Sequence, residues 1–209
     1  MQIRDAIAAA VDGRDLAYED MLDVVRQIMT GETTPAQIAG FLVALRMKGE
    51  TVDEITAAAT VMRDLSLKVD CDGSPPIATC GPGGDSTGTF NISTAAAFVV
   101  AAAGGHVAKH GNRSVSSSSG SAALLEGAGV KIALPPQEIA RAVRETGFGF
   151  MFAQAHHSAT RHAAGPRREL GIRTMFNVLG RLTNTACAPL HEMELLSLGR
   201  CPKSTEVLR

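Results

Sequence analysis

The sequence predicts an α/β protein in two parts: a small N-terminal helical domain, followed by an α/β domain with a mainly parallel sheet. Over residues 1–66, apolar side chains recur at the spacing of amphipathic helices. From residue 77 onward, short apolar runs alternate with glycine-rich turns and helical segments, a pattern typical of βα units. The 209 residues are 45% hydrophobic and 20% charged, which indicates a globular chain of one or two domains.

Four helices are predicted in the first part. Apolar periodicity indicates helices over residues 3–11 and 18–29. Thr34 and Pro35 supply an N-cap and a first-turn proline for the third helix. The fourth helix, residues 55–65, follows a capping box in which Thr51 and Glu54 satisfy each other's backbone donors. Residues 1–66 therefore form a four-helix unit.

The second part begins after a polar link over residues 70–76. Strands are expected at residues 77–80, 106–109, 130–134 and 148–153, and helices at residues 93–103, 119–127 and 138–146. Because helices separate the strands, a parallel sheet is the economical topology. From residue 157 to residue 182 the pattern becomes helical again.

Composition limits the classes of partner. Twenty Lys and Arg residues nearly cancel 21 Asp and Glu residues, so the net charge gives no reason to expect a nucleic acid or a membrane surface. The most apolar stretch, residues 95–105, is shorter than the roughly 20 residues that span a bilayer.

The N-terminus and the cysteines bear on the cellular location. The N-terminus lacks the basic segment followed by an apolar segment that marks a signal peptide, which predicts a cytoplasmic protein. The cysteines show no C-x-x-C spacing, so reduced thiols are expected.

A glycine-rich segment, residues 80–94, connects a predicted strand to a predicted helix. Its glycines allow close backbone approach to a ligand, and its N–H groups and those of the helix start converge on one volume. Asn91, Ser93 and Thr94 add polar side chains there. The segment matches neither the P-loop nor the dinucleotide fingerprint. It is a candidate phosphate site, and the alternative is a plain tight turn with a helix cap.

A second polar segment, residues 109–121, also runs from a strand to a helix. It therefore lies at the same edge of the sheet, where open α/β sheets bind ligands. Lys109 and Arg113 fall in a stretch without acidic residues between Asp85 and Glu126, so a polyphosphate is the expected occupant. The alternative is a solvated serine-rich surface loop.

A third candidate, residues 156–174, carries histidines and arginines. An arginine there can bind a carboxylate through two hydrogen bonds. A solvated basic helix face is the alternative, and the histidines lack metal-ligand spacing.

Residues 81–94, 109–121 and 167–183 closely resemble the anthranilate phosphoribosyltransferases, which have the nucleoside-phosphorylase-like fold. The segment Lys-His-Gly-Asn-Arg-Ser-Val-Ser-Ser, residues 109–117, is highly specific, and the resemblance covers residues 1 to about 186. It implies transfer of the phosphoribosyl group of phosphoribosyl pyrophosphate (PRPP) to anthranilate in tryptophan biosynthesis, with release of pyrophosphate and assistance by Mg²⁺. Because such a reaction needs charge stabilisation of the leaving group, no protein nucleophile is expected.

The resemblance also implies the site residues. The residues expected to line the PRPP site are Gly81, Gly84, Asp85, Thr89, Asn91, Ser93, Thr94, Lys109, His110, Gly111, Asn112, Arg113, Ser114, Val115, Ser116, Ser117 and Ser121. Ser93 is also expected to bind Mg²⁺. Anthranilate is expected to contact Gly81, Asn112 and Arg167, with the arginine pairing its carboxylate.

The family fold implies the domain division and the oligomeric state. Residues 158–183 are expected to join residues 1–66 in the helical domain, which forms a homodimer, and residues 70–157 make the α/β domain. Residues 187–209 are expected to be an atypical tail. Chains of the family extend further and contain an adjacent Asp-Glu pair that binds Mg²⁺, so this chain is expected to be truncated, with an incomplete sheet.

Other departures concern the loops. Pro82 stands where the family usually has threonine, and it removes a backbone donor from the first loop. Ser158 replaces a usual proline. Two alternatives remain open: an inactive remnant that keeps a phosphate pocket and a helical dimer face, or a related pyrimidine-nucleoside phosphorylase. Asn112 and Arg167 favour anthranilate over a nucleoside, because an aromatic acid needs a partner for its carboxylate.

Overall fold

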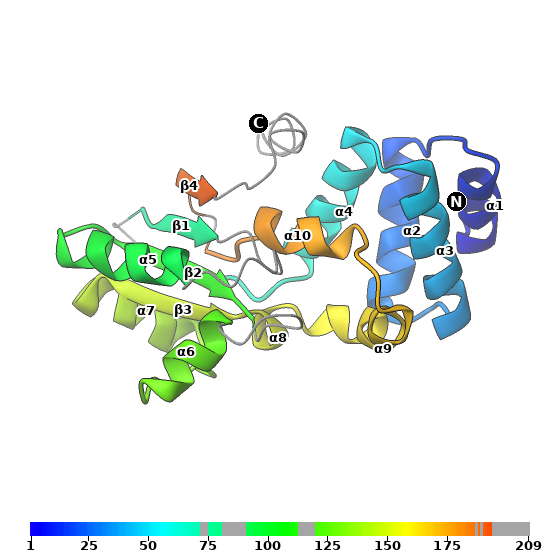
Figure 1. The fold of residues 1–209 in the computed structure, drawn as a ribbon. Helices are drawn as coiled ribbons and strands as arrows, with labels where there is room; N and C mark the ends of the chain where they lie inside the picture. Colours follow the sequence, from blue (N-terminus) through cyan, green and yellow to red (C-terminus); the bar gives the residue numbers. More distant parts are fainter. Residues whose placement is uncertain (72–74, 81–90, 113–119, 187, 189, 194–209) are drawn as a thin grey trace. The chain divides into compact units, whose positions relative to one another are not determined.

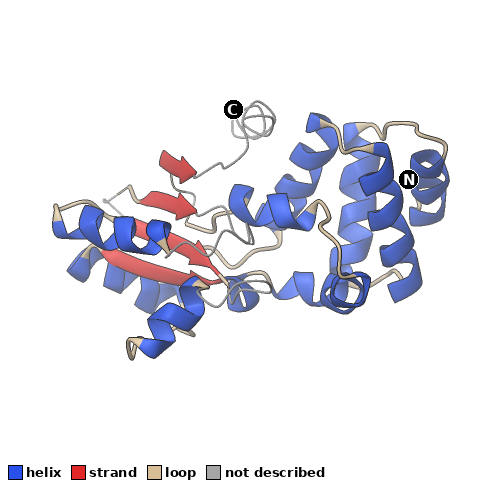
Figure 2. Ribbon diagram, in the orientation of Figure 1, coloured by secondary structure: helices blue, strands red, loops and turns tan. Residues whose placement is uncertain are grey.

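The computed structural model describes residues 1–71, 75–80, 91–112, 120–186, 188 and 190–193. The chain divides into two compact units. The first, called the helical unit below, contains Met1–Ser66 and His157–Thr183. The second, called the α/β unit, contains Leu67–His156 and continues after residue 183. Figure 1 labels the elements of both units, and Figure 2 colours them by type.

The helical unit is built from helices alone within its described residues. They are α1 (Ile3–Val11), α2 (Tyr18–Thr30), α3 (Pro35–Lys48), α4 (Val52–Asp64), a 3₁₀ turn (Ser158–Thr160), α9 (Arg161–Leu170) and α10 (Phe176–Leu182). Helix α2 packs on α4 and α1 on α3, while α9 packs against α2 and α3. Met21, Ile28, Phe41 and Leu45 are fully buried and form part of its core. The predicted first four helices are confirmed.

Local capping signals explain where two of these helices begin. Thr51 and Glu54 form the predicted capping box at α4. At α3, Thr34 caps the helix and Pro35 occupies its first position, as predicted. Gln37 completes a second capping box there, which the sequence pattern alone did not single out. Helix α2 ends at Gly31, whose φ of 83° is left-handed.

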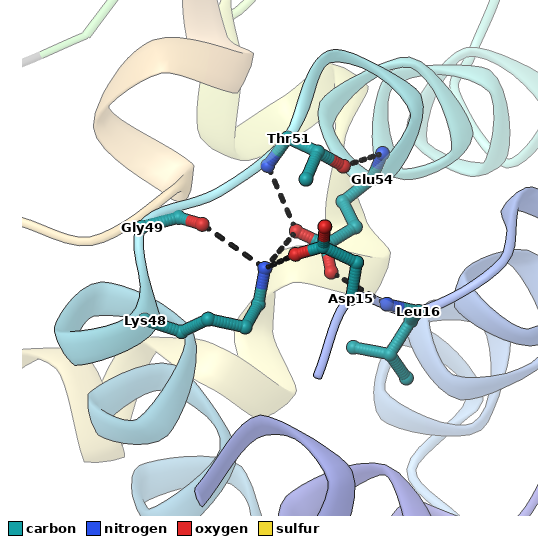
Figure 3. Close-up of polar contacts among 6 residues, drawn as sticks. All are labelled: Asp15, Leu16, Lys48, Gly49, Thr51 and Glu54. Atoms are coloured by element: carbon teal, nitrogen blue, oxygen red, sulfur yellow. Dashed lines mark hydrogen bonds and ion pairs between the residues drawn. The ribbon is translucent and has the colours of Figure 1, made fainter. Parts of the chain in front are cut away.

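An ionic cluster centred on the buried Glu54, drawn in Figure 3, links α3, α4 and the segment before α2. The Glu54 side chain is fully buried and accepts hydrogen bonds from Leu16 N at 2.9 Å, Thr51 N at 2.9 Å and Lys48 Nζ at 3.0 Å. Lys48 Nζ also donates to Asp15 Oδ1 at 2.6 Å. Burial lowers the pKa of Lys48, but the hydrogen bonds to Asp15 and Glu54 outweigh it, so this pKa is raised. The cluster therefore holds a charged lysine inside the helical unit.

The α/β unit has a parallel sheet. Its elements are β1 (Ile77–Cys80), α5 (Ile92–Ala102), β2 (Val107–Gly111), α6 (Ser121–Gly127), α7 (Pro136–Thr146), β3 (Phe148–Phe152), α8 (Ala153–His156) and β4 (Leu190–Met193). Within the described residues the strand order is β3-β2-β1-β4, and every neighbouring pair is parallel. The predicted fold class, a helical part plus an α/β part with a mainly parallel sheet, is confirmed.

Alternate residues of β3 supply two separate cores. Met151 packs with Ile139 and Val143 of α7, whereas Phe150 packs with Ala122 and Leu125 of α6. Successive side chains of a strand point to opposite faces, so helices cover both faces of the sheet. The stacked rings of Phe98 in α5 and Phe148 place α5 on the same face as Phe150. Figure 2 shows helices on either side of the strands.

The predicted strand over residues 130–134 is wrong. Residues 130–135 form a connection between α6 and α7 and are not part of the described sheet. The strand that follows β2 along the chain is β3, which pairs with β2 from Val107↔Phe148 to Gly111↔Phe152. The apolar pattern that suggested a strand reflects packing: Ile132 is buried among the α6 side chains, and Leu134 lies against the α7 core. No helix of the described residues is long and apolar enough to cross a membrane.

Candidate active site

The carboxyl ends of β1, β2 and β3 meet at one edge of the sheet, because these strands are parallel. They end at Cys80, Gly111 and Phe152. The two loops predicted to bind PRPP follow β1 and β2, and thus leave from this edge. Several predicted residues of these loops lie outside the described residues: Gly81, Gly84, Asp85, Thr89, Arg113, Ser114, Val115, Ser116 and Ser117.

Asn91 organises the start of α5. Its Oδ1 accepts hydrogen bonds from Thr94 N at 3.1 Å and from Ser93 Oγ at 3.2 Å, which makes it the N-cap of this helix. Its Nδ2 donates to Oγ of Ser121, the first residue of α6, at 3.4 Å. One amide side chain therefore joins the starts of the two helices that follow the predicted phosphate loops.

Lys109 extends from β2 toward the same place. Its side chain is almost fully buried, with 1% of the residue exposed, and its Nζ donates to Ser93 Oγ at 3.0 Å. It also donates to the carbonyl oxygen and to Oγ1 of Thr79 in β1, both at 3.4 Å. Since a buried ammonium group is stable only when its hydrogen bonds are satisfied, these acceptors help to hold it in place. Lys109, Ser93, Asn91 and Ser121 form one hydrogen-bonded chain, called the edge cluster below.

Thr94 contributes a second polar atom to this region. The residue is fully buried, and its Oγ1 has no hydrogen-bond partner among the residues that the structure describes. A buried hydroxyl without a partner is rare in native proteins and often marks a place that a ligand or water completes. The start of α5 thus combines backbone N–H groups with an available hydroxyl.

The end of β2 is closely packed. A Cβ atom added to Gly111 would lie 2.7 Å from the Phe150 ring and 3.2 Å from Ser121 Cβ, so a larger residue there would force the Phe150 ring to shift. His110 is mostly buried, and Asn112, just beyond the strand, is exposed. Asn112 Oδ1 accepts a hydrogen bond from Gln154 Nε2 at 3.5 Å. The backbone at this edge is therefore held close to the sheet while the Asn112 side chain stays at the surface.

Arg167 belongs to α9 of the helical unit. It is half-buried, and its Cζ lies 5.1 Å from the centroid of the Phe176 ring. Burial lowers its pKa, although an arginine retains its charge at neutral pH. It forms no ion pair within the described part of the chain, so its charge is available to an anionic ligand.

The described residues do not form a metal site by themselves. They contain no group of three His, Cys, Asp or Glu residues that could hold an ion. Ser93 Oγ, the predicted Mg²⁺ ligand, already accepts a proton of the Lys109 ammonium group. Mg²⁺ usually binds through carboxylates and substrate phosphates, so Ser93 alone does not make a metal site.

His156 and His157, the adjacent residues at which the chain passes from the α/β unit back to the helical unit, have structural partners. His156 is buried, and its Nδ1 lies 3.1 Å from the carbonyl oxygen of Leu67. His157 Nε2 lies 3.0 Å from the carbonyl oxygen of Thr183. Each ring nitrogen faces a backbone carbonyl, so these side chains anchor chain segments within their own units.

Comparison with known proteins assigns the family. The model of the glycosyl transferase family, a/b domain, matches residues 74–209, and the model of its helical bundle domain matches residues 4–66. The chain belongs to this family. The match of the a/b domain includes residues 187–209, the expected atypical tail.

Similar proteins share one name, which confirms the resemblance seen in the sequence. Anthranilate phosphoribosyltransferase of Hahella chejuensis is 58% identical over 209 residues, which is 100% of this chain and 60% of that protein. The protein of that name from Chromohalobacter salexigens is 61% identical over 189 residues, 90% of this chain and 55% of its own length. The chain thus spans about three fifths of the length of the curated relatives it matches.

Solved structures of the same name have the same fold. The Thermus thermophilus anthranilate phosphoribosyltransferase superposes with a TM-score of 0.91 at 45% identity, covering 98% of this chain and 62% of that one. The Saccharomyces cerevisiae protein in complex with PRPP and Mg has a TM-score of 0.89, covering 98% of this chain and 61% of its own. At 24% identity, the second likeness shows the fold alone.

Sequence reasoning missed Thr79. A threonine in a strand of otherwise apolar residues gave a weak signal, because hydroxyls occur in strands for many reasons. Only the register shows its importance: Ile77 pairs with Val107, so Thr79 lies beside Lys109 two residues further along each strand.

Proposed function

We propose that this chain carries the substrate sites of an anthranilate phosphoribosyltransferase, which transfers the phosphoribosyl group of PRPP to anthranilate with release of pyrophosphate, in tryptophan biosynthesis. The observation that carries the proposal is the edge cluster, in which a buried lysine, a capped helix start and two serine hydroxyls meet at the carboxyl edge of a parallel sheet. Relatives of 58% and 61% identity bear this name.

The edge cluster suits the charge that develops in this reaction. As the bond from ribose C1 to pyrophosphate breaks, negative charge accumulates on the leaving group. Oriented cations and N–H dipoles in a site of low dielectric stabilise such charge without reorganising. Lys109 supplies the cation, and the start of α5 supplies N–H groups. The remaining predicted PRPP contacts, in the loops after β1 and β2, are part of the proposal.

Arg167 is proposed to bind the carboxylate of anthranilate. Arg167 carries an available guanidinium group beside the Phe176 ring, which suits a ligand with a carboxylate on an aromatic ring. The amine of anthranilate attacks C1 as the bond to pyrophosphate breaks, and the proton that the amine loses passes to solvent or to the released pyrophosphate. No described residue is assigned as nucleophile or as general base.

The proposal includes Mg²⁺ because a similar protein binds it, and not because of a metal site in this chain. The Saccharomyces cerevisiae protein was solved in complex with both PRPP and Mg. The described residues of this chain do not fit a metal centre of their own, so no step is derived through the ion, and Ser93 as its ligand stays a prediction. Mg²⁺ commonly binds through substrate phosphates, so it is proposed to bind together with the donor.

Two further parts of the proposal concern assembly and location. We propose a homodimer formed through the helical unit, as the family resemblance implies; Val11 in α1 and Met47 in α3, 70% and 83% exposed, are apolar side chains of this unit that a partner could cover. Size-exclusion chromatography with light scattering tests this.

A cytoplasmic location and the absence of nucleic-acid partners stay predictions from the sequence.

Anthranilate fluorescence tests the activity. The proposal predicts loss of fluorescence only when PRPP, Mg²⁺ and the folded chain are all present. No loss in the presence of all three would contradict transferase activity of this chain. If such a sample still binds PRPP, the result favours the alternative of an inactive chain with a phosphate pocket.

A further inference from the structure

Thr79 lies beside Lys109 on one face of the sheet. Strands β1 and β2 are parallel with Ile77 opposite Val107, which places Thr79 and Lys109 as cross-strand neighbours. Both residues are 1% exposed. The threonine side chain is therefore a permanent part of the surroundings of the ammonium group.

Thr79 offers Lys109 Nζ two acceptors, and Ser93 offers it another. The carbonyl oxygen and Oγ1 of Thr79 each lie 3.4 Å from Nζ, while Ser93 Oγ lies at 3.0 Å. An ammonium group has three protons and a flexible four-carbon chain, so its direction is set by the acceptors it meets. The threonine holds it from the β1 side, and the serine holds it from the start of α5.

We propose that Thr79 is a positioning residue of the donor site: through its hydroxyl it keeps the Lys109 ammonium group at the carboxyl edge of the sheet, where the PRPP phosphates are expected. This inference rests on the proposed function for the identity of the ligand. Thr79 itself acts through Lys109 and touches no substrate.

The hydroxyl can be tested separately from the carbonyl. Thr79→Val keeps the shape and the strand preference of the side chain but removes Oγ1, whereas Thr79→Ser keeps a hydroxyl. The backbone carbonyl remains in both. Thr185→Val is a matched control, because Thr185 is a fully buried threonine of the same unit whose hydroxyl donates to Met151 Sδ at 3.0 Å.

The first measurement reads Lys109 directly and needs no substrate. The whole chain is acetylated with a trace of acetic anhydride at fixed pH, and mass spectrometry compares Lys109 with the exposed Lys131. In Thr79→Val, Lys109 labelling relative to Lys131 is expected to rise about three- to tenfold, since an ammonium group with one acceptor fewer leaves its buried position more often and meets the reagent there. Thr79→Ser and Thr185→Val are expected to stay within about twofold of the unsubstituted chain. Equal labelling in Thr79→Val and the unsubstituted chain would overturn the proposal.

The second measurement is calorimetric titration with PRPP. Thr79→Val is expected to bind about three- to tenfold more weakly, because a lysine that has lost one of its acceptors is less well ordered before binding, and Thr79→Ser to recover most of the loss. Binding by Thr79→Val equal to that of the unsubstituted chain would also overturn the positioning role. If the unsubstituted chain binds no PRPP, the proposed function fails, while the labelling still decides whether Thr79 holds Lys109.

Discussion

Replacing Glu54 by glutamine is expected to destabilise the helical unit strongly. The substitution keeps the size of the side chain but turns one carboxylate oxygen into an NH₂ donor. If the amide group occupies the place of Oε2, it faces the Thr51 N–H and the Lys48 ammonium group; in the place of Oε1 it faces the Leu16 N–H. Either orientation sets a donor against a donor inside a fully buried site.

The magnitude follows from the bonds lost. A hydrogen bond to a charged group contributes about 1.5–3 kcal/mol, and a buried donor left without an acceptor costs about 1–3 kcal/mol. The free energy of unfolding is thus expected to fall by about 3 kcal/mol, near the cost of breaking a buried ion pair. Urea unfolding followed by far-UV circular dichroism measures this, because the helical unit supplies much of the helical signal and the chain has no tryptophan.

The control for this substitution is Asp53→Asn. Asp53 precedes Glu54 in the same turn of α4 but is exposed, so its neutralisation is expected to change the free energy of unfolding by at most about 0.5 kcal/mol. A change of similar size in Glu54→Gln would refute the reasoning.

The raised pKa of Lys48 makes the stability depend on pH. The contribution of Lys48 to the free energy of unfolding is complete below about pH 10.5 and is lost as the pH rises through the raised value.

Three further predictions concern the site and the linkage to pH. Ser93→Ala removes the acceptor that lies closest to Lys109 Nζ among the described residues and is expected to weaken PRPP binding about tenfold in calorimetry, with little change in the circular dichroism spectrum; unaltered affinity would argue against the edge cluster as donor site. Arg167→Ala is expected to weaken anthranilate binding by about ten- to a hundredfold while PRPP affinity stays within twofold, measured by fluorescence titration; equal losses for both ligands would point to a structural role. Burial lowers the pKa of His156, partly offset by the Leu67 carbonyl, so its contribution to stability is complete above about pH 6.5 and is lost as the pH falls toward the lowered value. Thermal unfolding of the unsubstituted chain and of His156→Gln between pH 5 and pH 8 tests this, and the variant is expected to have the flatter profile.

Local sequence signals predicted the helices well. Thr51 with Glu54, and Thr34 with Pro35, mark helix starts through contacts between residues at most three positions apart. The α/β unit was also predictable from local signals, because each strand and each helix has its own period of apolar residues. The failed strand over residues 130–134 shows the limit of this approach: apolar alternation reports burial, and burial does not require strand pairing.

Contacts between distant residues could not be predicted. The position of Thr79 beside Lys109 depends on the register of two strands joined by a long connection. Glu54 was predicted as a capping residue, but its bonds to Leu16 and Lys48 arise only when the helices pack. The sequence identified Asn91, Ser93 and Lys109 as one candidate site because loops after parallel strands share an edge, and the structure joins them by hydrogen bonds.

Calorimetric titration of the folded chain with PRPP, with and without Mg²⁺, tests the central claim most directly. The edge cluster predicts saturable binding of one PRPP per chain, and markedly weaker binding when Ser93 is replaced by alanine. Absence of binding by a chain whose circular dichroism shows it to be folded would contradict the assignment of the carboxyl edge of the sheet as the donor site.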